Sequence, residues 1–407
     1  MTQNQFYNSK RKIFLILSHY KFREFDYYKH ELAYLKKIPK LKVIIHDLSG
    51  VVNNKQFNDC WMNPSHISAV KFFSLVRWIF DFIKIINKNK NILIYNKIEC
   101  INFSSFIIYC ILKIYNLPIL VAVSPQIASA QIKKDYYYFI SKLLNNFFKI
   151  RLIYFYTNFH IFSFLNRFIK FSKIISLKSG YGKTNNFIHG NIEYLNSNSF
   201  DASNHLTLKN KKNLIQKNYI LYLDSPTPYF KGDRYILGEY YKKNEIENWY
   251  YNLVIFFNNL ENIFNSKIII IPHHKNKGFE NTYFNQFEIN HKNDASIRLS
   301  ANCKFIISKG STAISSAIIN YKPIIFIYSS WYKNNKNYIK NLFYLTKLLD
   351  AKAINIEKYI DKEISNSLSV NKKKYDLYKY KFLTHKNIEN TPNYKIIKDV
   401  IKKIFNV

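Results

Sequence analysis

The sequence contains no uncharged apolar run long enough to span a bilayer. The two nearest candidates, Ala69–Ile86 and Phe147–Phe171, are rich in aromatic residues but are broken by Lys or Arg every few positions. We interpret both as core helices with a solvated basic face; the alternative, for which Phe147–Phe171 is the stronger candidate, is a helix that lies on an anionic membrane surface. The apolar run Ile13–Leu17 is too short for a signal peptide and no small-residue cleavage site follows it, so we predict a first strand there.

Metal-binding and disulfide patterns are also missing. The four cysteines are Cys60, Cys100, Cys110 and Cys303, and their spacing matches neither a metal site nor a dense disulfide framework. This pattern favours a reducing compartment, so we predict a cytoplasmic protein. The sequence has no Asp-x-Asp pair that would suggest a bound metal ion. We therefore predict no metal site and no cofactor.

Acidic residues are scarce. The 26 Asp and Glu stand against 61 Lys and Arg, which gives a formal net charge of +35. Such a charge favours a negatively charged partner: nucleic acid, an anionic membrane surface or a phosphorylated substrate. Part of the lysine excess accompanies a high content of Asn, Ile, Tyr and Phe, as an AT-rich genome would produce. Because the lysines are dispersed and no nucleic-acid-binding motif is present, nucleic acid is the least favoured of these partners.

The sequence does contain abundant apolar residues, at 48%, in a regular order. Short apolar runs of strand length alternate with helix-length segments, which predicts an α/β protein with parallel sheets covered on both faces. We predict a Rossmann-like domain over residues 1–184, a polar linker over 185–218, a second Rossmann-like domain over 219–369 and a lysine-rich helical segment over 370–407 that packs back across the halves. A ligand is then expected in the central cleft that the two domains face.

Polar clusters follow three of the predicted strands in the second half. They are Asp224 to Asp233 after "YILYL", Pro272-His273-His274-Lys275 after "KIIII", and Ser308-Lys309-Gly310-Ser311-Thr312 after "KFII". Ligands of open parallel sheets bind beyond the carboxyl ends of the strands, so the three clusters are expected at one edge of one sheet.

Each cluster also has a purely structural interpretation. Asp224 could begin a turn, and Ser311 or Thr312 could cap a helix. Capping is compatible with phosphate binding, because a helix start carries backbone N–H groups and Gly310 permits close approach of a ligand. His273, His274 and Lys275 could be surface residues, but imidazole and ammonium groups can also neutralise a phosphate. We favour nucleotide phosphate binding by His273, His274, Lys275, Ser308, Gly310, Ser311 and Thr312.

The stretch from Tyr219 to Ser330 resembles the C-terminal domain of GT-B glycosyltransferases that use CMP-activated acidic sugars, the bacterial sialyltransferase and Kdo-transferase types. The stretches "LYLDSPTPYFKGD" and "STAISSAIINYKPIIFI" also resemble uncharacterised proteins of surface-polysaccharide gene clusters. The resemblance implies that His273 contacts the cytidine phosphate and that Ser311 and Thr312 hold the phosphate at the helix start. The Pro that follows this His in the family is His274 here.

The resemblance implies a metal-independent glycosyltransferase that transfers a nonulosonic acid or Kdo-class sugar from a CMP-activated donor to a surface polysaccharide or lipid-linked glycan. Glycosyl transfer needs a base for the acceptor hydroxyl, and the candidates are Asp224, Asp26 and Asp47, with Asp224 ranked first. A peripheral position at the cytoplasmic face of the inner membrane would suit such an acceptor. Two alternatives stay open: a teichoic-acid-type polyol-phosphate transferase that uses a CDP-activated donor, and a non-enzymatic basic nucleic-acid-binding protein.

Overall fold

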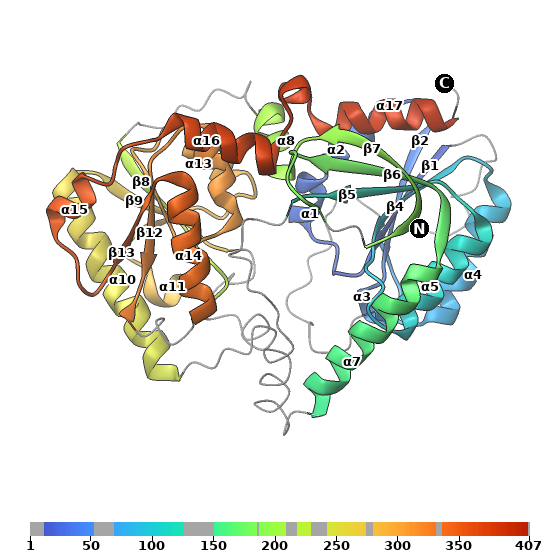
Figure 1. Ribbon diagram of the computed structural model, residues 1–407, viewed down its shortest axis with the longest axis horizontal. Coiled ribbons are helices and arrows are strands. Elements are labelled where there is room, and N and C mark those ends of the chain that lie inside the picture. Colours follow the sequence, from blue (N-terminus) through green and yellow to red (C-terminus); the bar gives the residue numbers. More distant parts are fainter. Residues whose placement is uncertain are drawn as a thin grey trace.

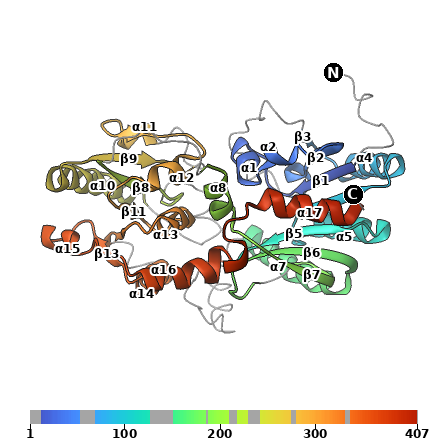
Figure 2. The same cartoon turned by 90° about the horizontal axis from the view of Figure 1, so that it is seen from above.

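The computed structural model describes residues 12–52, 69–125, 150–184, 187–208, 218–228, 242–273, 280–330 and 336–405. These residues form two parallel β-sheets that lie side by side, each covered by helices (Figures 1 and 2). The predicted α/β fold class with two Rossmann-like halves is confirmed.

The first sheet has seven strands in the order β3-β2-β1-β4-β5-β6-β7. The strands are β1 (Lys12–Ser18), β2 (Leu41–Asp47), β3 (Ala69–Lys71), β4 (Ile92–Lys97), β5 (Ile119–Val123), β6 (Lys170–Ser179) and β7 (His189–Ser197). All neighbouring strands pair in parallel. Side chains of β1 alternate between two buried clusters, with Ile13, Leu15 and Leu17 on one face and Phe14 and Ile16 on the other. A strand buried on both faces explains the unbroken apolar run in the sequence.

Helices cover both faces of this sheet. They are α1 (Glu24–Lys29), α2 (Leu32–Leu35), α3 (Ser49–Val52), α4 (Leu75–Lys88), α5 (Phe103–Tyr115) and α7 (Ile150–Leu165), followed by the 3₁₀ turn η3 (Asn166–Phe168). Helix α4 is the core helix predicted within Ala69–Ile86, because Trp78, Phe82 and Ile85 are buried against the sheet. No helix in the described part of the chain is long and apolar enough to cross a membrane.

The second sheet has six strands in the order β10-β9-β8-β11-β12-β13, again all parallel. The strands are β8 (Tyr219–Leu223), β9 (Lys267–Ile271), β10 (Glu288–Ile289), β11 (Ile306–Ser308), β12 (Ile324–Tyr328) and β13 (Lys352–Asn355). The helices here are α10 (Lys243–Phe264), α11 (Glu280–Tyr283), α12 (Ala295–Ser300), η4 (Thr312–Ile314), α13 (Ser315–Ile319), α14 (Lys336–Leu349) and α15 (Asp361–Ser365). Helix α10 packs Trp249, Phe256 and Leu260 on one face of the sheet.

The last segment of the chain contacts both halves. Helix α16 (Lys372–Tyr378) and the π-helical turn η6 (Lys379–Leu383) pack on the second sheet through Tyr375 and Phe382. After the 3₁₀ turn η7 (Lys386–Ile388), helix α17 (Asn393–Phe405) buries Ile397, Val400 and Ile401 against the first sheet (Figure 2).

The stretch 185–218 differs from the polar linker expected from its composition. It includes β7, which pairs with β6 at the edge of the first sheet, and helix α8 (Phe200–Leu208). Most side chains of β7 are at least partly exposed, since the strand lies at the sheet edge. An exposed edge strand has the composition of a loop, so composition alone did not identify it.

Candidate active site in the cleft between the two sheets

The described residues of the three polar clusters lie at one edge of the second sheet, as expected from their positions after predicted strands. Strand β8 pairs with both β9 and β11, and all three run parallel. Asp224, His273 and the Ser308–Thr312 turn therefore follow adjacent carboxyl ends. A sequence pattern of apolar run followed by polar residues was sufficient to find this edge, because parallel strands end together.

This edge opens into a cavity of about 400 Å³ between the two halves. The second half contributes Asp224, Pro272, His273, His291, Lys292, Ser311, Thr312 and Ser315 to the lining, the first half contributes Phe25, Lys29, Ser124 and Pro125, and the connecting segment contributes Ser199, Phe200 and Asp201. The cleft expected between two doubly wound domains is thus present, with His273 and Ser311 in the same cavity. His274 and Lys275 lie outside the described residues.

The Ser308–Thr312 turn is organised by its first residue. Ser308 is fully buried, and its Oγ accepts hydrogen bonds from the backbone N–H groups of Gly310 and Ser311, each at 3.1 Å. Gly310 has a φ of +96°, a conformation that favours glycine. The Ser308 hydroxyl and these two N–H groups are therefore engaged within the turn, which differs from the expectation that Ser308 faces a ligand.

Ser311 and Thr312, in contrast, are among the residues that line the cavity. The Ser311 Oγ accepts a hydrogen bond from Ala313 N at 3.3 Å and caps the 3₁₀ turn η4. The expected helix of small residues is this turn followed by the five-residue helix α13. Capping by Ser311 is an observation, and phosphate binding by Ser311 and Thr312 remains a prediction.

Lys309 joins this turn to the loop after β8. Its Nζ donates to the backbone oxygen of Thr227 at 2.9 Å and to Thr227 Oγ1 at 3.1 Å. The ammonium group also lies 5.2 Å from the ring centroids of both Trp249 and Tyr338. Cation–π contacts and hydrogen bonds together favour a fixed position for a buried lysine. Lys309 therefore links the loops that follow β8 and β11.

Asp224 joins the ends of β8 and β9. Its Oδ1 accepts a hydrogen bond from the Tyr222 hydroxyl at 3.3 Å, and its Oδ2 accepts one from His273 N at 3.4 Å. Only 6% of Asp224 is exposed. Burial, and secondarily the Asp224 charge, raises the pKa of Tyr222 well above its usual value. Asp224 thus holds the segment that carries His273, a contact that sequence reasoning did not foresee.

The other two candidate bases, Asp26 and Asp47, are not among the residues that line the cavity. Asp47 is fully buried and accepts hydrogen bonds from the backbone of Phe22 at 3.1 Å and of Ser49 at 3.0 Å. Asp26 forms an ion pair with Lys97 at 3.6 Å. Burial lowers the pKa of Lys97 to about 8, although the Asp26 charge acts in the opposite direction. Both carboxylates stabilise the carboxyl edge of the first sheet.

Asp201 is the cavity carboxylate that sequence reasoning missed. It lies in the first turn of α8, inside the stretch interpreted as a linker. Burial raises the pKa of Asp201, while the Lys29 charge and a hydrogen bond with Ser315 act in the opposite direction. A sequence signal was available: Ser199 Oγ accepts from Ala202 N at 3.3 Å, and Ser followed by an acidic residue is typical of a helix start.

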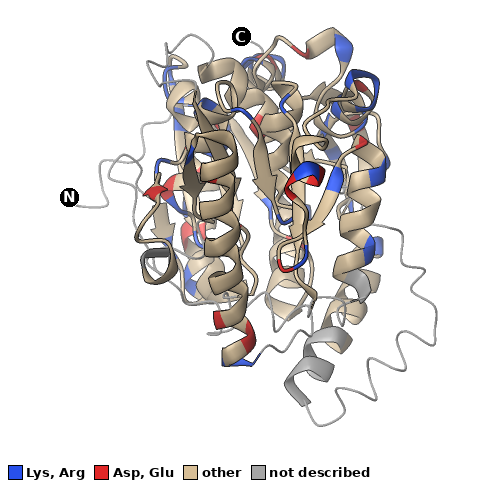
Figure 3. Ribbon diagram, turned by 90° about the vertical axis from the view of Figure 1, so that its left-hand side faces the viewer, with Lys and Arg blue, Asp and Glu red and all other residues tan. Residues whose placement is uncertain are grey.

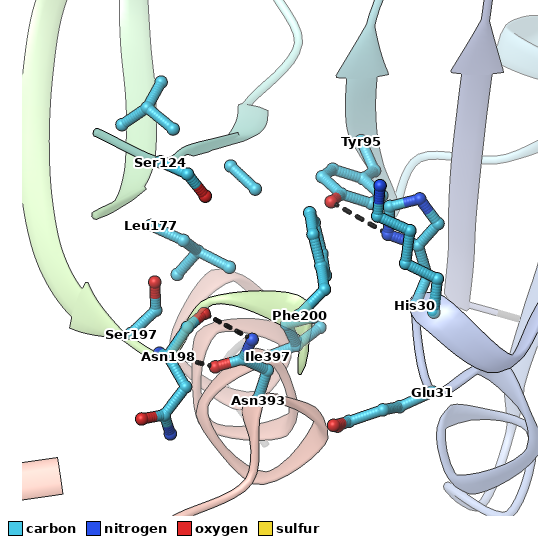
Figure 4. Close-up of a pocket in the computed structure, with 13 residues that line it drawn as sticks. His30, Glu31, Tyr95, Ser124, Leu177, Ser197, Asn198, Phe200, Asn393 and Ile397 are labelled. Atoms are coloured by element: carbon cyan, nitrogen blue, oxygen red, sulfur yellow. Dashed lines mark hydrogen bonds between the residues drawn. The ribbon is translucent and has the colours of Figure 1, made fainter. Parts of the chain in front are cut away.

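Helix α8 is anchored next to the cleft by a cluster of hydrogen-bonded polar residues, called the polar joint below (Figure 4). Asn393 Nδ2 donates to Asn198 O at 2.8 Å, and Asn198 N donates to Asn393 Oδ1 at 2.9 Å. The Glu31 carboxylate accepts hydrogen bonds from Ser203 Oγ and from Tyr394 N. These contacts join α2, α8 and α17, where the chain passes twice between the halves. The space left among these residues is about 10 Å³, enough for about one water molecule.

Within the described ranges, no group of three or more His, Cys, Asp or Glu residues is arranged to hold a metal ion. The described cysteines, Cys100, Cys110 and Cys303, are free thiols.

No family model and no curated protein matches the sequence. Among solved structures, the wall teichoic acid polymerase TagF is similar over 98% of this chain and 90% of its own, with a TM-score of 0.51 and 13% identity. A histidine variant of the same polymerase soaked with CDPG gives a TM-score of 0.50 at 13% identity over the same shares. UDP-GlcNAc 2-epimerase from Methanocaldococcus jannaschii is similar over 96% of this chain and 99% of its own, with a TM-score of 0.44 and 11% identity. The likeness to the polymerase concerns the fold, which is GT-B-like with two Rossmann-like domains, as the sequence resemblance implied.

Proposed function

We propose that this protein is a transferase that binds a cytidine-nucleotide-activated donor in the cleft and releases CMP. The observation that carries the proposal is the convergence of His273, Ser311 and Thr312 on one cavity at the carboxyl edge of the second sheet. Imidazole and hydroxyl groups among the residues that line one cavity suit a phosphate whose negative charge grows as it departs. Lys29 and Lys292 add positive charge to the same lining.

The first candidate reaction is transfer of a polyol phosphate from a CDP-activated donor, the teichoic-acid type. Its support is the similarity of the fold to TagF over nearly the whole chain, including a structure of that polymerase soaked with CDPG. The second candidate is transfer of an acidic sugar from a CMP-activated donor, which the strand-His and Ser-Thr segments resemble. Both reactions release CMP, so both need the same binding contacts to the cytidine phosphate.

Calorimetry tests the shared part of the proposal. CMP should bind in the micromolar range, and UMP and GMP at least tenfold more weakly, because a cytosine-selective pocket leaves polar groups unpaired with the other bases. Equal binding of all three nucleotides would contradict the cytidine assignment. Absence of binding by CMP, CDP and UDP would contradict a nucleotide-activated donor altogether.

The two donor types are separated by the bond that breaks. Donor hydrolysis in ¹⁸O-labelled water should place the label in the polyol phosphate if water attacks phosphorus, and in the sugar hydroxyl if it attacks the anomeric carbon. Mass spectrometry of products from CDP-glycerol and from CMP-N-acetylneuraminic acid distinguishes the two outcomes. Label in the sugar would replace the first candidate by the second.

We further propose that the acceptor is a glycan or lipid-linked chain and that the protein contacts an anionic membrane peripherally. Apolar side chains are exposed on helices that cover one side of the first sheet (Figure 1): Phe80 on α4, Phe103 on α5 and Phe164 on α7. Aromatic side chains with basic neighbours are typical of interfacial helices. Flotation with anionic vesicles at low salt, reversed at high salt, is expected; no flotation at low salt would contradict membrane contact.

Nucleic-acid binding is not supported by the distribution of charge. Lys and Arg are spread over many helices and loops of the described chain instead of forming one stripe (Figure 3). A nucleic-acid-binding surface typically concentrates positive charge on one face or element.

A further inference from the structure

Helix α8 places the carboxylate of Asp201 in the cleft. Asp201 lines the same cavity as His273, Ser311 and Thr312. The helix is packed between α1 of the first half and α12 and α13 of the second. The polar joint at Asn198 and Ser203 fixes both ends of its first turn. Asp201 is thus held at a defined place between the carboxyl edge of the second sheet and the first sheet.

The surroundings of Asp201 suit a proton acceptor. Its carboxylate lies within hydrogen-bonding reach of Ser315, and the positive charge of Lys29 from α1 acts to lower its pKa. Tyr378 of α16 is close enough for the Asp201 charge to raise its pKa, after the larger effect of burial. The other titratable groups of the lining are Asp224, His273, His291 and Lys292. Partial removal from water makes Asp201 a stronger base than a surface carboxylate, as its raised pKa reflects.

Asp224, the other carboxylate in the described lining, is committed elsewhere. Its two oxygens accept hydrogen bonds from Tyr222 and from the backbone of His273. Protonation of Asp224 during turnover would weaken the contact that holds His273 beside the donor phosphate. Asp224 therefore suits the role of a positioning residue, and Asp201 is the remaining carboxylate of the described lining.

We propose that the carboxylate of Asp201 is the general base that accepts the proton of the acceptor hydroxyl. This inference rests on the proposed function. The hydroxyl oxygen forms a bond to the β-phosphorus of the CDP-activated donor, and the bond from that phosphorus to the bridging oxygen breaks. The electron pair leaves with CMP, and the hydroxyl proton passes to Asp201 and from there to solvent. With a CMP-activated sugar, the same proton transfer accompanies attack on the anomeric carbon.

The test uses the full chain with water as the acceptor and CDP-glycerol or CMP-N-acetylneuraminic acid as the donor. CMP release is measured against pH for the wild type, Asp201→Asn and Asp201→Ala. We expect Asp201→Asn to lose roughly 100-fold or more of CMP release while CMP affinity by calorimetry changes less than about threefold. The acidic limb of the wild-type pH profile should disappear in Asp201→Asn. Sodium formate should restore part of the activity of Asp201→Ala, because it supplies a carboxylate to the vacated space.

The matched control is Asp361→Asn. Asp361 also lies in the first turn of a short helix, α15, but its exposed carboxylate bonds only Asn259 among the contacts described, at 3.0 Å. This variant should keep wild-type CMP release and the acidic limb. It separates loss of a helix-start carboxylate from loss of a base.

The outcomes distinguish this inference from the proposed function. Wild-type-like CMP release by Asp201→Asn, with normal CMP binding, would overturn the role of Asp201 and leave the proposed function standing. Loss of activity that matches a lowered melting temperature, without formate rescue, would show that Asp201 only supports α8. A wild-type protein that binds no CMP and releases none from either donor would overturn the proposed function and this inference together.

Discussion

Replacing both Ser311 and Thr312 by Ala separates helix capping from phosphate binding. Ser311 makes one capping hydrogen bond, at 3.3 Å to Ala313 N, and Thr312 is exposed. Loss of the cap should lower the free energy of unfolding by about 1 kcal/mol, and the Thr312 change should add less than about 0.5 kcal/mol. If both hydroxyls also bind the donor phosphate, the double variant loses roughly 1.5 to 3 kcal/mol of CMP binding, a 10- to 150-fold weakening.

Calorimetry with CMP and with cytidine measures the difference, and urea unfolding measures stability. The matched control is Ser316→Ala: the Ser316 hydroxyl donates to Ala313 O at 2.8 Å, but this buried side chain is not among those that line the cavity. Its loss should cost stability and leave CMP affinity unchanged. Cytidine should bind equally to all three proteins. Equal losses for CMP and cytidine in the double variant would refute phosphate binding by this turn.

Three further predictions concern single residues. His273→Ala should weaken CMP binding about tenfold in calorimetry and leave cytidine binding unchanged; equal weakening of both ligands would count against a phosphate contact. Burial lowers the pKa of His30 well below its usual 6.5, so only the unfolded state gains a proton between pH 7 and 5, and the free energy of unfolding should fall by about 2 kcal/mol over that range. Urea unfolding of His30→Gln should lack this contribution. The same dependence of unfolding free energy on pH in the variant and the wild type would exclude His30. Gly190→Ala should unfold the first sheet, because the new Cβ would lie 2.1 Å from Phe171 O at a φ of +142°. In Gly310→Ala the nearest atom would be 3.9 Å from the new Cβ, so this variant should lose only about 1 to 2 kcal/mol of stability through backbone strain. Similar thermal stabilities of the two variants would contradict this contrast.

The sheets and the carboxyl edge of the second sheet were predictable because they depend on local patterns. Runs such as "KIIII" are buried on both faces of a parallel sheet, and each such run is followed at once by the polar residues of its carboxyl end. Asp224, His273 and Ser311 could therefore be placed together without any knowledge of packing. Their hydrogen bonds could not be foreseen, since the bond from His273 N to Asp224 joins residues that follow two different strands.

The first-sheet side of the cleft was not predictable in the same way. Asp26 and Asp47 also lie at or near strand ends, but Asp47 accepts backbone N–H groups from Phe22 and from Ser49 at the start of α3, and Asp26 pairs with Lys97. Sequence position gives no measure of how many donors surround a carboxylate. Asp201, in contrast, lies in a stretch with the composition of a linker, and only the packing of α8 between the halves brings it into the cleft. Whether a carboxylate is committed to the backbone or available to a ligand depends on tertiary contacts.

The net positive charge of the chain, which first suggested an anionic ligand, is not concentrated in the cleft. Among the described lining residues two lysines, Lys29 and Lys292, face two aspartates, Asp201 and Asp224, so the cavity is formally neutral while the whole chain carries +35. Screening at physiological salt acts over about 8 Å and weakens the effect of distant surface lysines on a bound phosphate. A donor phosphate would therefore depend on directed donors, for which we propose the imidazole of His273 and the hydroxyls of Ser311 and Thr312. For this reason the double hydroxyl variant is a sharper test of the site than any change of surface charge.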